Sequence, residues 1–243
     1  MEYLLLVLAG IAAGALNAAV GAGTLITFPA LVATGLNPVV ANGTSSLGLL
    51  PGNLTGAYAY RDYLTGQWKR IAPWIVATAI GAVVGALLVV KLPPGVFTAV
   101  VPWLIASACF LVLVQPLVKK LRRDEDRPLV AIIANGVVGI YGGYFGAGQG
   151  VAYLAVLGAF ATKTLQEANA FKNVLAGIAG LIATIIFCVS GVVSYGAALA
   201  VAVGALIGGA IGGYLAKLAP EWLFRLIVVA VGIVAMIQVI VKQ

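Results

Sequence analysis

Polar side chains recur at helical spacing inside two otherwise apolar stretches of this chain. They are Asn42, Ser45, Ser46 and Asn53 in the first stretch and Asn169, Lys172 and Asn173 in the second. Steps of three, four and eleven residues place each set on one face of a helix. Every member is neutral or positive and can donate a hydrogen bond. The chemistry that this combination predicts is the binding of a compact anion.

Lys172 occupies the place that Ser45 holds in the other stretch. It lies about two turns inside a segment that begins near Leu165, roughly 10 Å deep at ~1.5 Å per residue. An ammonium group at that depth in a membrane costs a few kcal/mol unless it has a partner. Two interpretations stay open: Lys172 binds the anion in the interior, or its side chain extends to the aqueous interface.

Glycine-rich runs break two further apolar stretches at matching positions, residues 21–23 and 146–150. Glycine permits backbone conformations that other residues resist, and inside a membrane irregular backbone survives only where it lines a cavity or is buried in protein. A helix that begins after each break, near Thr24 and near Gln149, would offer free amide N–H groups and the positive end of its dipole. The breaks therefore predict a second source of anion-binding groups.

The alternative interpretation of these glycines is that they only let helices pack closely. We make that interpretation for Gly81-x-x-x-Gly85 and for Gly204, Gly208 and Gly212, and we favour an anion site at the two duplicated breaks. The substrate-binding set predicted from both features is Asn17, Gly21, Gly23, Thr24, Asn42, Ser45, Ser46, Gly146, Gly148, Gln149, Asn169, Lys172 and Asn173.

Glu167 is the one acidic residue near this set. The sequence Thr164-Leu-Gln-Glu167 is typical of a capping box, so we interpret Glu167 as a helix-capping residue, with proton coupling as the alternative. Asn37 and Pro38 likewise predict the start of the helix that carries Asn42. The chain has no histidine, and its two cysteines stand alone in apolar segments, so neither a metal site nor a cofactor is predicted.

The elements that carry these residues occur twice. Residues 14–23 return as residues 139–148, an offset of 125 (139 minus 14), and Lys91-Leu-Pro-Pro94 returns as Lys217-Leu-Ala-Pro220. We therefore divide the chain into an N-terminal repeat (1–118), a charged cytoplasmic linker (119–128) and a C-terminal repeat (129–243). Duplicated apolar halves with broken segments in matching positions are typical of secondary transporters.

The composition predicts an all-α integral membrane protein. Hydrophobic residues make up 63% of the chain and charged residues 9%, well outside the range of soluble domains. The second and seventh of the apolar stretches are too short to cross a bilayer, which takes about 20 residues. The stretches are 4–20, 24–34, 38–60, 71–90, 96–118, 129–145, 150–161, 165–189, 195–215 and 222–241.

The distribution of lysine and arginine predicts the topology. If all ten stretches reverse the chain, the bases divide twelve against two between the two sides; eight spans in two parallel repeats would divide them nine against five. We therefore predict two inverted repeats of about five segments with both termini outside, and re-entrant hairpins at the broken segments would preserve the same sides. The net charge is +7, but five of the fourteen bases crowd the polar linker together with three acids, a pattern typical of a cytoplasmic loop, which argues against nucleic acid as a partner.

The paired motifs resemble those of the sulfite exporter TauE/SafE family of membrane permeases. The resemblance rests on residues 17–23 with Phe28-Pro29, on residues 41–46, on the second glycine-rich run and on residues 168–173, and it extends over essentially the whole chain. It implies a multi-pass transporter of the bacterial or archaeal inner membrane. The implied substrates are small sulfur-containing anions such as sulfite, sulfoacetate or other organosulfonates, and about eight spans are usual.

The predicted function is secondary transport of such an anion by alternating access, with membrane lipid and the anion as partners. Export or facilitated flux is favoured, because a cytoplasm-negative potential drives anions outward by about 2.3 kcal/mol per charge per 100 mV and no buried carboxylate cluster for coupling is evident. The alternatives are an anion channel and a membrane enzyme acting on lipid phosphates. The enzyme would need convergent acids, bases or metals, so we predict none. A homodimer stays open.

Overall fold

The computed structural model describes residues 2–19, 21–59, 61–118, 128–160, 162, 164–218, 226, 229–234 and 236. The described chain is helical and contains no strand. Its elements are α1 (Glu2–Ala19), α2 (Thr24–Ala33), α3 (Pro38–Ala59), the 3₁₀ turn η1 (Arg61–Leu64), α4 (Trp68–Lys91), α5 (Pro94–Val118), α6 (Pro128–Tyr144), α7 (Gln149–Phe160), α8 (Leu165–Val189) and α9 (Tyr195–Leu218). The predicted linker except Pro128, which opens α6, and most of the tenth predicted segment lie outside the described residues.

The two predicted helix breaks are confirmed. Helix α1 ends at Ala19 and α2 begins at Thr24, while α6 ends at Tyr144 and α7 begins at Gln149. Three glycines in the breaks take left-handed backbone angles, with φ of 77° at Gly21, 73° at Gly146 and 70° at Gly148, a region that side chains rarely tolerate. Helices α2 and α7 are short, with 10 and 12 residues, as the lengths of their apolar stretches predicted.

The predicted starts of α3 and α8 are also confirmed. Asn37 Oδ1 accepts a hydrogen bond from the amide of Val39 at 3.0 Å, directly before the proline that opens α3. Thr164 Oγ1 accepts one from the amide of Glu167 at 3.1 Å and caps α8. Both caps satisfy an N–H that the first turn of a helix leaves unpaired.

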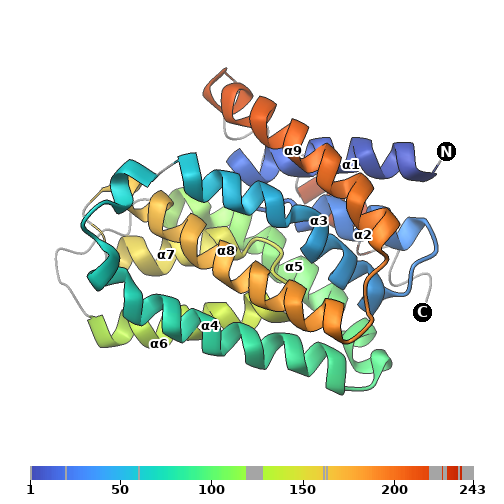
Figure 1. Ribbon diagram of the computed structural model, residues 1–243, viewed down its shortest axis with the longest axis horizontal. Coiled ribbons are helices and arrows are strands. Elements are labelled where there is room, and N and C mark those ends of the chain that lie inside the picture. The colour runs from blue at the N-terminus through green and yellow to red at the C-terminus, as the bar shows by residue number, and fades with distance from the viewer. Residues whose placement is uncertain are drawn as a thin grey trace.

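Helices α3 and α8 pack together and lie, in the view of Figure 1, between two further helix pairs that join the two halves of the sequence. Helix α1 packs on α9, and α4 packs on α6. Glycines allow both approaches: a Cβ at Gly81 or Gly85 would clash with backbone carbonyls of α6, and one at Gly204 or Gly208 with carbonyls of α1. The packing interpretation of these four glycines is confirmed, and Gly212 lies where side chains are not described.

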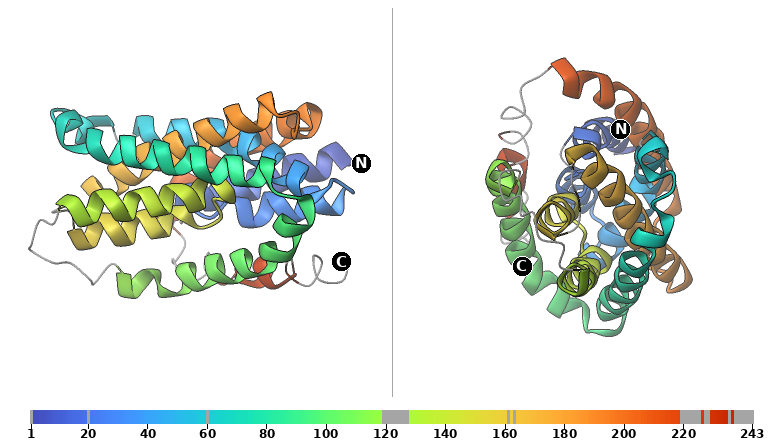
Figure 2. Two further views of the ribbon diagram at one scale, coloured as in Figure 1. Left: turned by 90° about the horizontal axis from the view of Figure 1, so that it is seen from below. Right: turned by 90° about the vertical axis from the view of Figure 1, so that its left-hand side faces the viewer.

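The two broken segments form hairpins that approach from opposite ends of the molecule. Helices α1 and α2 lie in the half that contains the N-terminus, and α6 and α7 lie side by side in the other half (Figure 2). Their tips meet in the middle, because a Cβ at Gly150 would lie only 3.2 Å from Gly21 Cα. The chain thus brings two helix starts from distant parts of the sequence to one point.

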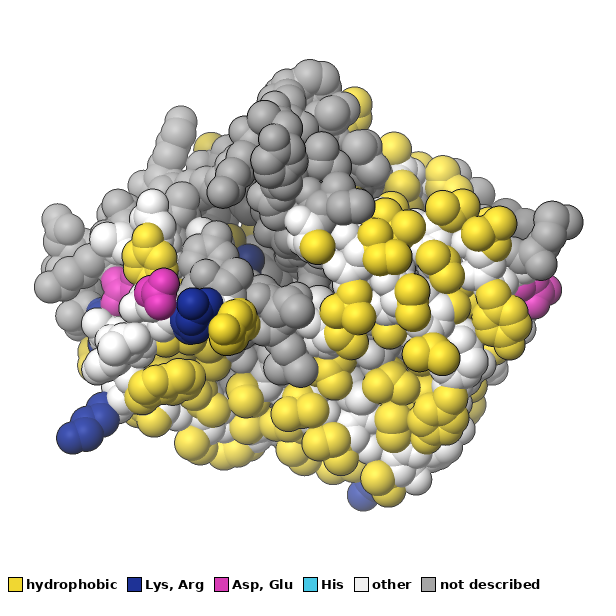
Figure 3. Space-filling model, turned by 45° about the horizontal axis from the view of Figure 1, so that its top comes forward, with side chains coloured by type: hydrophobic (Ala, Val, Ile, Leu, Met, Phe, Trp, Pro, Cys, Tyr) yellow, Lys and Arg dark blue, Asp and Glu magenta, His cyan; other side chains and the backbone are white. Residues whose placement is uncertain are grey.

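Large apolar side chains cover much of the surface as well as the core. Figure 3 shows hydrophobic side chains spread over one face, with the charged ones near its edges. Among the described residues, three helical segments are long and apolar enough to cross a membrane: Trp68–Lys91, Pro94–Val114 and Gln166–Val189. Exposed apolar surface of this extent would be unfavourable in water, so the protein is an all-helical, multi-pass membrane protein.

Candidate functional site

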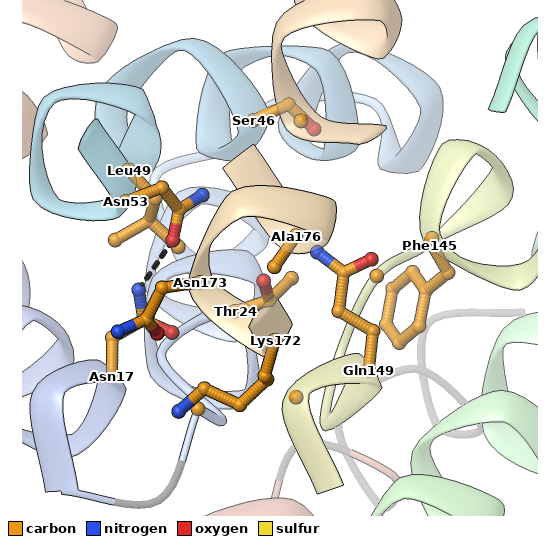
Figure 4. Close-up of a pocket in the computed structure, with 15 residues that line it drawn as sticks. Asn17, Thr24, Ser46, Leu49, Asn53, Phe145, Gln149, Lys172, Asn173 and Ala176 are labelled. Carbon is orange, nitrogen blue, oxygen red and sulfur yellow. Dashed lines mark hydrogen bonds between the residues drawn. The ribbon is translucent and has the colours of Figure 1, made fainter. Parts of the chain in front are cut away.

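A small polar pocket lies where the two hairpin tips meet α3 and α8, with a cavity volume of about 40 Å³ (Figure 4). Eight of the thirteen residues predicted from the sequence line it: Asn17, Gly21, Thr24, Ser46, Gly146, Gln149, Lys172 and Asn173. Residues from both halves of the chain contribute. The remaining lining residues are Leu49, Asn53, Gly142, Phe145, Gly150, Ala176 and Gly180.

Lys172 is the only ionisable side chain among the lining residues, and the residue is 6% exposed. A Cβ at Gly150 would lie 3.5 Å from Lys172 Cδ. The aliphatic part of the lysine side chain therefore runs past the first turn of α7 at van der Waals distance. The buried position corresponds to the interior interpretation of Lys172 rather than to extension toward the interface. The described lining residues contribute this one cationic side chain and no carboxylate.

The helix starts contribute fewer free amides than the sequence suggested. The amide of Gln149 donates to Gly146 O at 3.3 Å, and that of Leu25 donates to Ala22 O at 3.2 Å. These local bonds form because the left-handed glycines fold the chain back on itself. Within the described residues, the amides of Thr24 and Gly150 donate to no backbone carbonyl, and they lie at the positive ends of the two helix dipoles.

Gln149 brings its side-chain amide into the pocket through space that glycines leave open. A Cβ at Gly142 would clash with Gln149 Oε1. Among the described residues Oε1 is buried and has no hydrogen-bond partner, an arrangement that is costly unless a ligand or water supplies one. Sequence reasoning missed Gly142, although its place within the repeated stretch 139–148 was a usable signal.

Five predicted site residues lie away from the pocket: Gly23, Asn42, Ser45, Gly148 and Asn169. Asn42 Nδ2 donates to Tyr144 O at 2.9 Å, which ties α3 to the last residue of α6. The hydroxyls of Ser45 and Thr27 are 2.5 Å apart and join α3 to α2. Neighbouring positions on α3 thus face different helices, and only Ser46 and Asn53 of the first polar set reach the pocket.

The two glycines outside the pocket are placed by packing. A Cβ at Gly23 would lie 2.7 Å from Ala13 O in α1, so this glycine closes the hairpin of α1 and α2. Gly148 faces Ala108 of α5, where a Cβ would be 3.4 Å from the alanine side chain. Ser46 reaches the pocket, but its hydroxyl already donates to Asn42 O at 3.0 Å, so its proton is engaged within α3.

Glu167 forms an ion pair with Arg70, with 2.6 Å between Oε1 and Nη1. The capping role of Thr164 is confirmed, but the carboxylate of Glu167 faces α4 of the other half of the chain, 97 residues away. The pair joins α4 to α8 near the start of each helix. It gives Glu167 a structural function that requires no proton transfer.

Replacing Arg70 or Glu167 by glutamine is expected to lower stability by about 1 kcal/mol, a value for partly exposed pairs; the two side chains are 32% and 13% exposed. Thermal unfolding in detergent measures the effect. The double variant should lose little more than either single variant, and exchanging the two residues should restore part of the loss. If the loss of stability in the double variant equals the sum of the two single losses, the interaction between Arg70 and Glu167 makes no contribution to stability.

No group of three or more His, Cys, Asp or Glu side chains that could hold a metal occurs among the described residues. The described residues of the site offer hydrogen-bond donors and one cationic side chain as binding groups for an anion. A polar pocket between two broken helices, inside an apolar helical bundle, defines a membrane transporter permease.

The comparison with known families supports this class. The sequence profile of the family "Sulfite exporter TauE/SafE" matches residues 6–239, and the chain belongs to that family. Two relatives are similar over about three quarters of the chain. The "Probable membrane transporter protein YfcA" of Escherichia coli (strain K12) is 27% identical over 184 residues, 74% of this chain and 67% of the relative. A "Probable membrane transporter protein" of Haemophilus influenzae is 26% identical over 192 residues, 75% of this chain and 72% of the relative.

A third relative is more similar over a shorter region. The "Probable membrane transporter protein ORF9" of a Sinorhizobium species is 30% identical over 149 residues, 60% of this chain and 56% of the relative. No solved structure matches the chain. The family and the relatives' names agree on a membrane transporter.

Proposed function

We propose that this protein is a secondary transporter that binds a compact oxyanion of sulfur, with sulfite as the best fit, in the pocket between its two hairpin tips. One observation carries the proposal: the lining residues that the structure describes include a buried lysine, several N–H donors and no carboxylate. Such a lining favours an anion over a cation, because N–H groups donate hydrogen bonds to an anion and the ammonium group repels a cation. Each hydrogen bond to a charged ligand contributes about 1.5–3 kcal/mol.

The size of the pocket favours a ligand with few atoms. A single water needs about 10–15 Å³ of cavity, so a volume of about 40 Å³ suits roughly three to four heavy atoms, by the same measure. Sulfite has one sulfur and three oxygens and fits this limit. Sulfoacetate and other organosulfonates carry an additional carbon arm, which fits a pocket of this volume less well.

The packing pattern supports the inverted-repeat hypothesis. Helix α1 pairs with α9 and α4 with α6, so the first helix of each predicted repeat packs on the fourth helix of the other. The hairpins enter from opposite ends (Figure 2), which favours the version with re-entrant hairpins. In that arrangement the two repeats could tilt around a shared central site and expose it alternately to either side.

The direction that we propose is export. A membrane potential that is negative inside moves anions outward without a coupled ion, by about 2.3 kcal/mol per charge per 100 mV. The ion pair between Arg70 and Glu167 favours a structural role for Glu167, the earlier candidate for proton coupling.

Flux of sulfite from vesicles that contain the purified protein tests the proposal. We expect saturable efflux that accelerates when a potassium gradient with valinomycin makes the interior negative. Absence of saturable flux for sulfite and other small oxyanions would overturn the proposed function. Single-channel currents would instead identify the anion-channel alternative.

Competition between anions provides a prediction about size. Sulfite is expected to bind at least about tenfold more tightly than sulfoacetate, since a pocket for roughly four heavy atoms must open before it admits the larger anion. Inhibition of labelled sulfite efflux by each unlabelled anion measures the ratio. Equal inhibition by the two anions would show that a larger site than this pocket binds the substrate.

A further inference from the structure

Asn53 lines the pocket, although it was outside the predicted substrate-binding set. Asn17 Nδ2 donates a hydrogen bond to Asn53 Oδ1 at 2.7 Å, joining α1 to α3. Figure 4 shows this bond at one side of the pocket, with Asn173 beside it and Gln149 on the other side of Lys172. The bond spans 36 residues of sequence, so it depends on the packing of the first hairpin against α3.

This hydrogen bond fixes which end of the Asn53 amide faces the ligand. Because Oδ1 accepts from Asn17, the amide is held with Nδ2 pointing away from Asn17. Within the described residues, Asn53 Nδ2 donates to no protein acceptor. Two N–H groups are therefore available on the pocket side of a side chain whose orientation is already set.

Gly180 on α8 keeps the space beside this donor open. A Cβ at Gly180 would lie 3.3 Å from Asn53 Nδ2, closer than ordinary van der Waals contact. Gly180 also lines the pocket. The absence of a side chain at residue 180 thus leaves room for an oxygen atom next to the amide.

We propose that Asn53 is a substrate-binding residue that donates its Nδ2 hydrogens to an oxyanion, and that Asn17 is the positioning residue that orients it. The proposal rests on the proposed function and adds a selectivity element to it. Lys172 supplies charge, which attracts any anion. A fixed amide donor at the other wall favours ligands that place a hydrogen-bond-accepting oxygen at that point. It gives no such advantage to a halide, which is a single atom and has no oxygen to place there.

Equilibrium binding of sulfite to the purified protein in detergent, measured by calorimetry, tests the proposal. Asn53→Ala is expected to weaken sulfite binding by about 10-fold or more. Chloride competition should change by less than about twofold, since a monatomic ion held by Lys172 has no second atom to place at Asn53. Asn17→Ala should weaken sulfite binding less than Asn53→Ala does. The double variant should bind sulfite no more weakly than Asn53→Ala, because a positioning residue has nothing left to orient.

Two further variants separate this role from a general loss of structure. Asn53→Asp keeps the acceptor for Asn17 and replaces the donor by a carboxylate, so it should abolish sulfite binding while the protein remains folded by thermal unfolding. Gly180→Ala should weaken sulfite binding by several-fold. Gly177→Ala on the same helix is the matched control, since a Cβ there meets nothing within 4 Å.

The outcomes distinguish this proposal from the proposed function. If Lys172→Met weakens sulfite binding and Asn53→Ala changes it by less than about twofold, the role of Asn53 is overturned and the anion site stands. Losses that multiply in the Asn17 and Asn53 double variant would overturn the positioning role. If Lys172→Met and Asn53→Ala both leave sulfite binding unchanged, the pocket is not the anion site and both proposals fail.

Discussion

Replacement of Lys172 by methionine is expected to weaken sulfite binding by about 10- to 100-fold, which corresponds to the loss of one charged hydrogen bond of roughly 1.5–3 kcal/mol. Lys172 is the only ionisable side chain among the described residues that line the pocket, and it is 6% exposed. Its charge is poorly screened there, so its effect on an anion should be large. Methionine preserves most of the length and apolar packing of the lysine stem. Calorimetry in detergent and efflux from vesicles both measure the change.

Two controls accompany this prediction. Lys172→Arg keeps the positive charge and should retain part of the affinity, although a planar guanidinium is larger than an ammonium group in a pocket of about 40 Å³. Lys69→Met removes an exposed lysine near the start of α4 and should leave binding unchanged. An affinity that does not change in Lys172→Met would refute the anion site, whatever the transport rate.

Gly85→Ala, which adds a single methyl group, is expected to lower the unfolding temperature by about 5 °C or more. A Cβ at this position would clash with the carbonyl of Ile140 and lie 2.7 Å from the amide of Tyr144. Both atoms belong to the backbone of α6, so relief requires α4 and α6 to separate. Overpacking of this kind typically lowers the free energy of unfolding by about 1–3 kcal/mol. For a chain of this size, each kcal/mol lowers the unfolding temperature by about 2–4 °C.

Thermal unfolding in detergent compares Gly85→Ala with Gly177→Ala. The control places the same methyl group on a helix at a site where no atom of the described residues lies within 4 Å, and glycine-to-alanine substitution in a helix is otherwise favourable. We expect Gly177→Ala to unfold at or above the temperature of the parent protein. Equal unfolding temperatures for the parent protein and Gly85→Ala would show that the close packing of α4 and α6 is not a determinant of stability.

Local chemistry in the sequence determined where helices begin, break and end. The glycines at 21, 146 and 148 favour left-handed backbone that ends a helix, and Asn37 and Thr164 supply caps within three residues of the amides they bind. These features depend on neighbours in the chain, so they can be predicted without a tertiary structure. The apolar composition likewise determined that the protein lies in a membrane.

Only the tertiary structure decided which face of each helix meets the pocket. Ser45 and Ser46 are adjacent and equally polar, yet Ser45 contacts Thr27 while Ser46 lines the pocket. The contribution of Asn53, the space provided by Gly142 and Gly180, and the pairing of Arg70 with Glu167 all depend on contacts between distant segments. Helical periodicity gives the angle between side chains on one helix, but the packing of several helices sets the direction in which that face points.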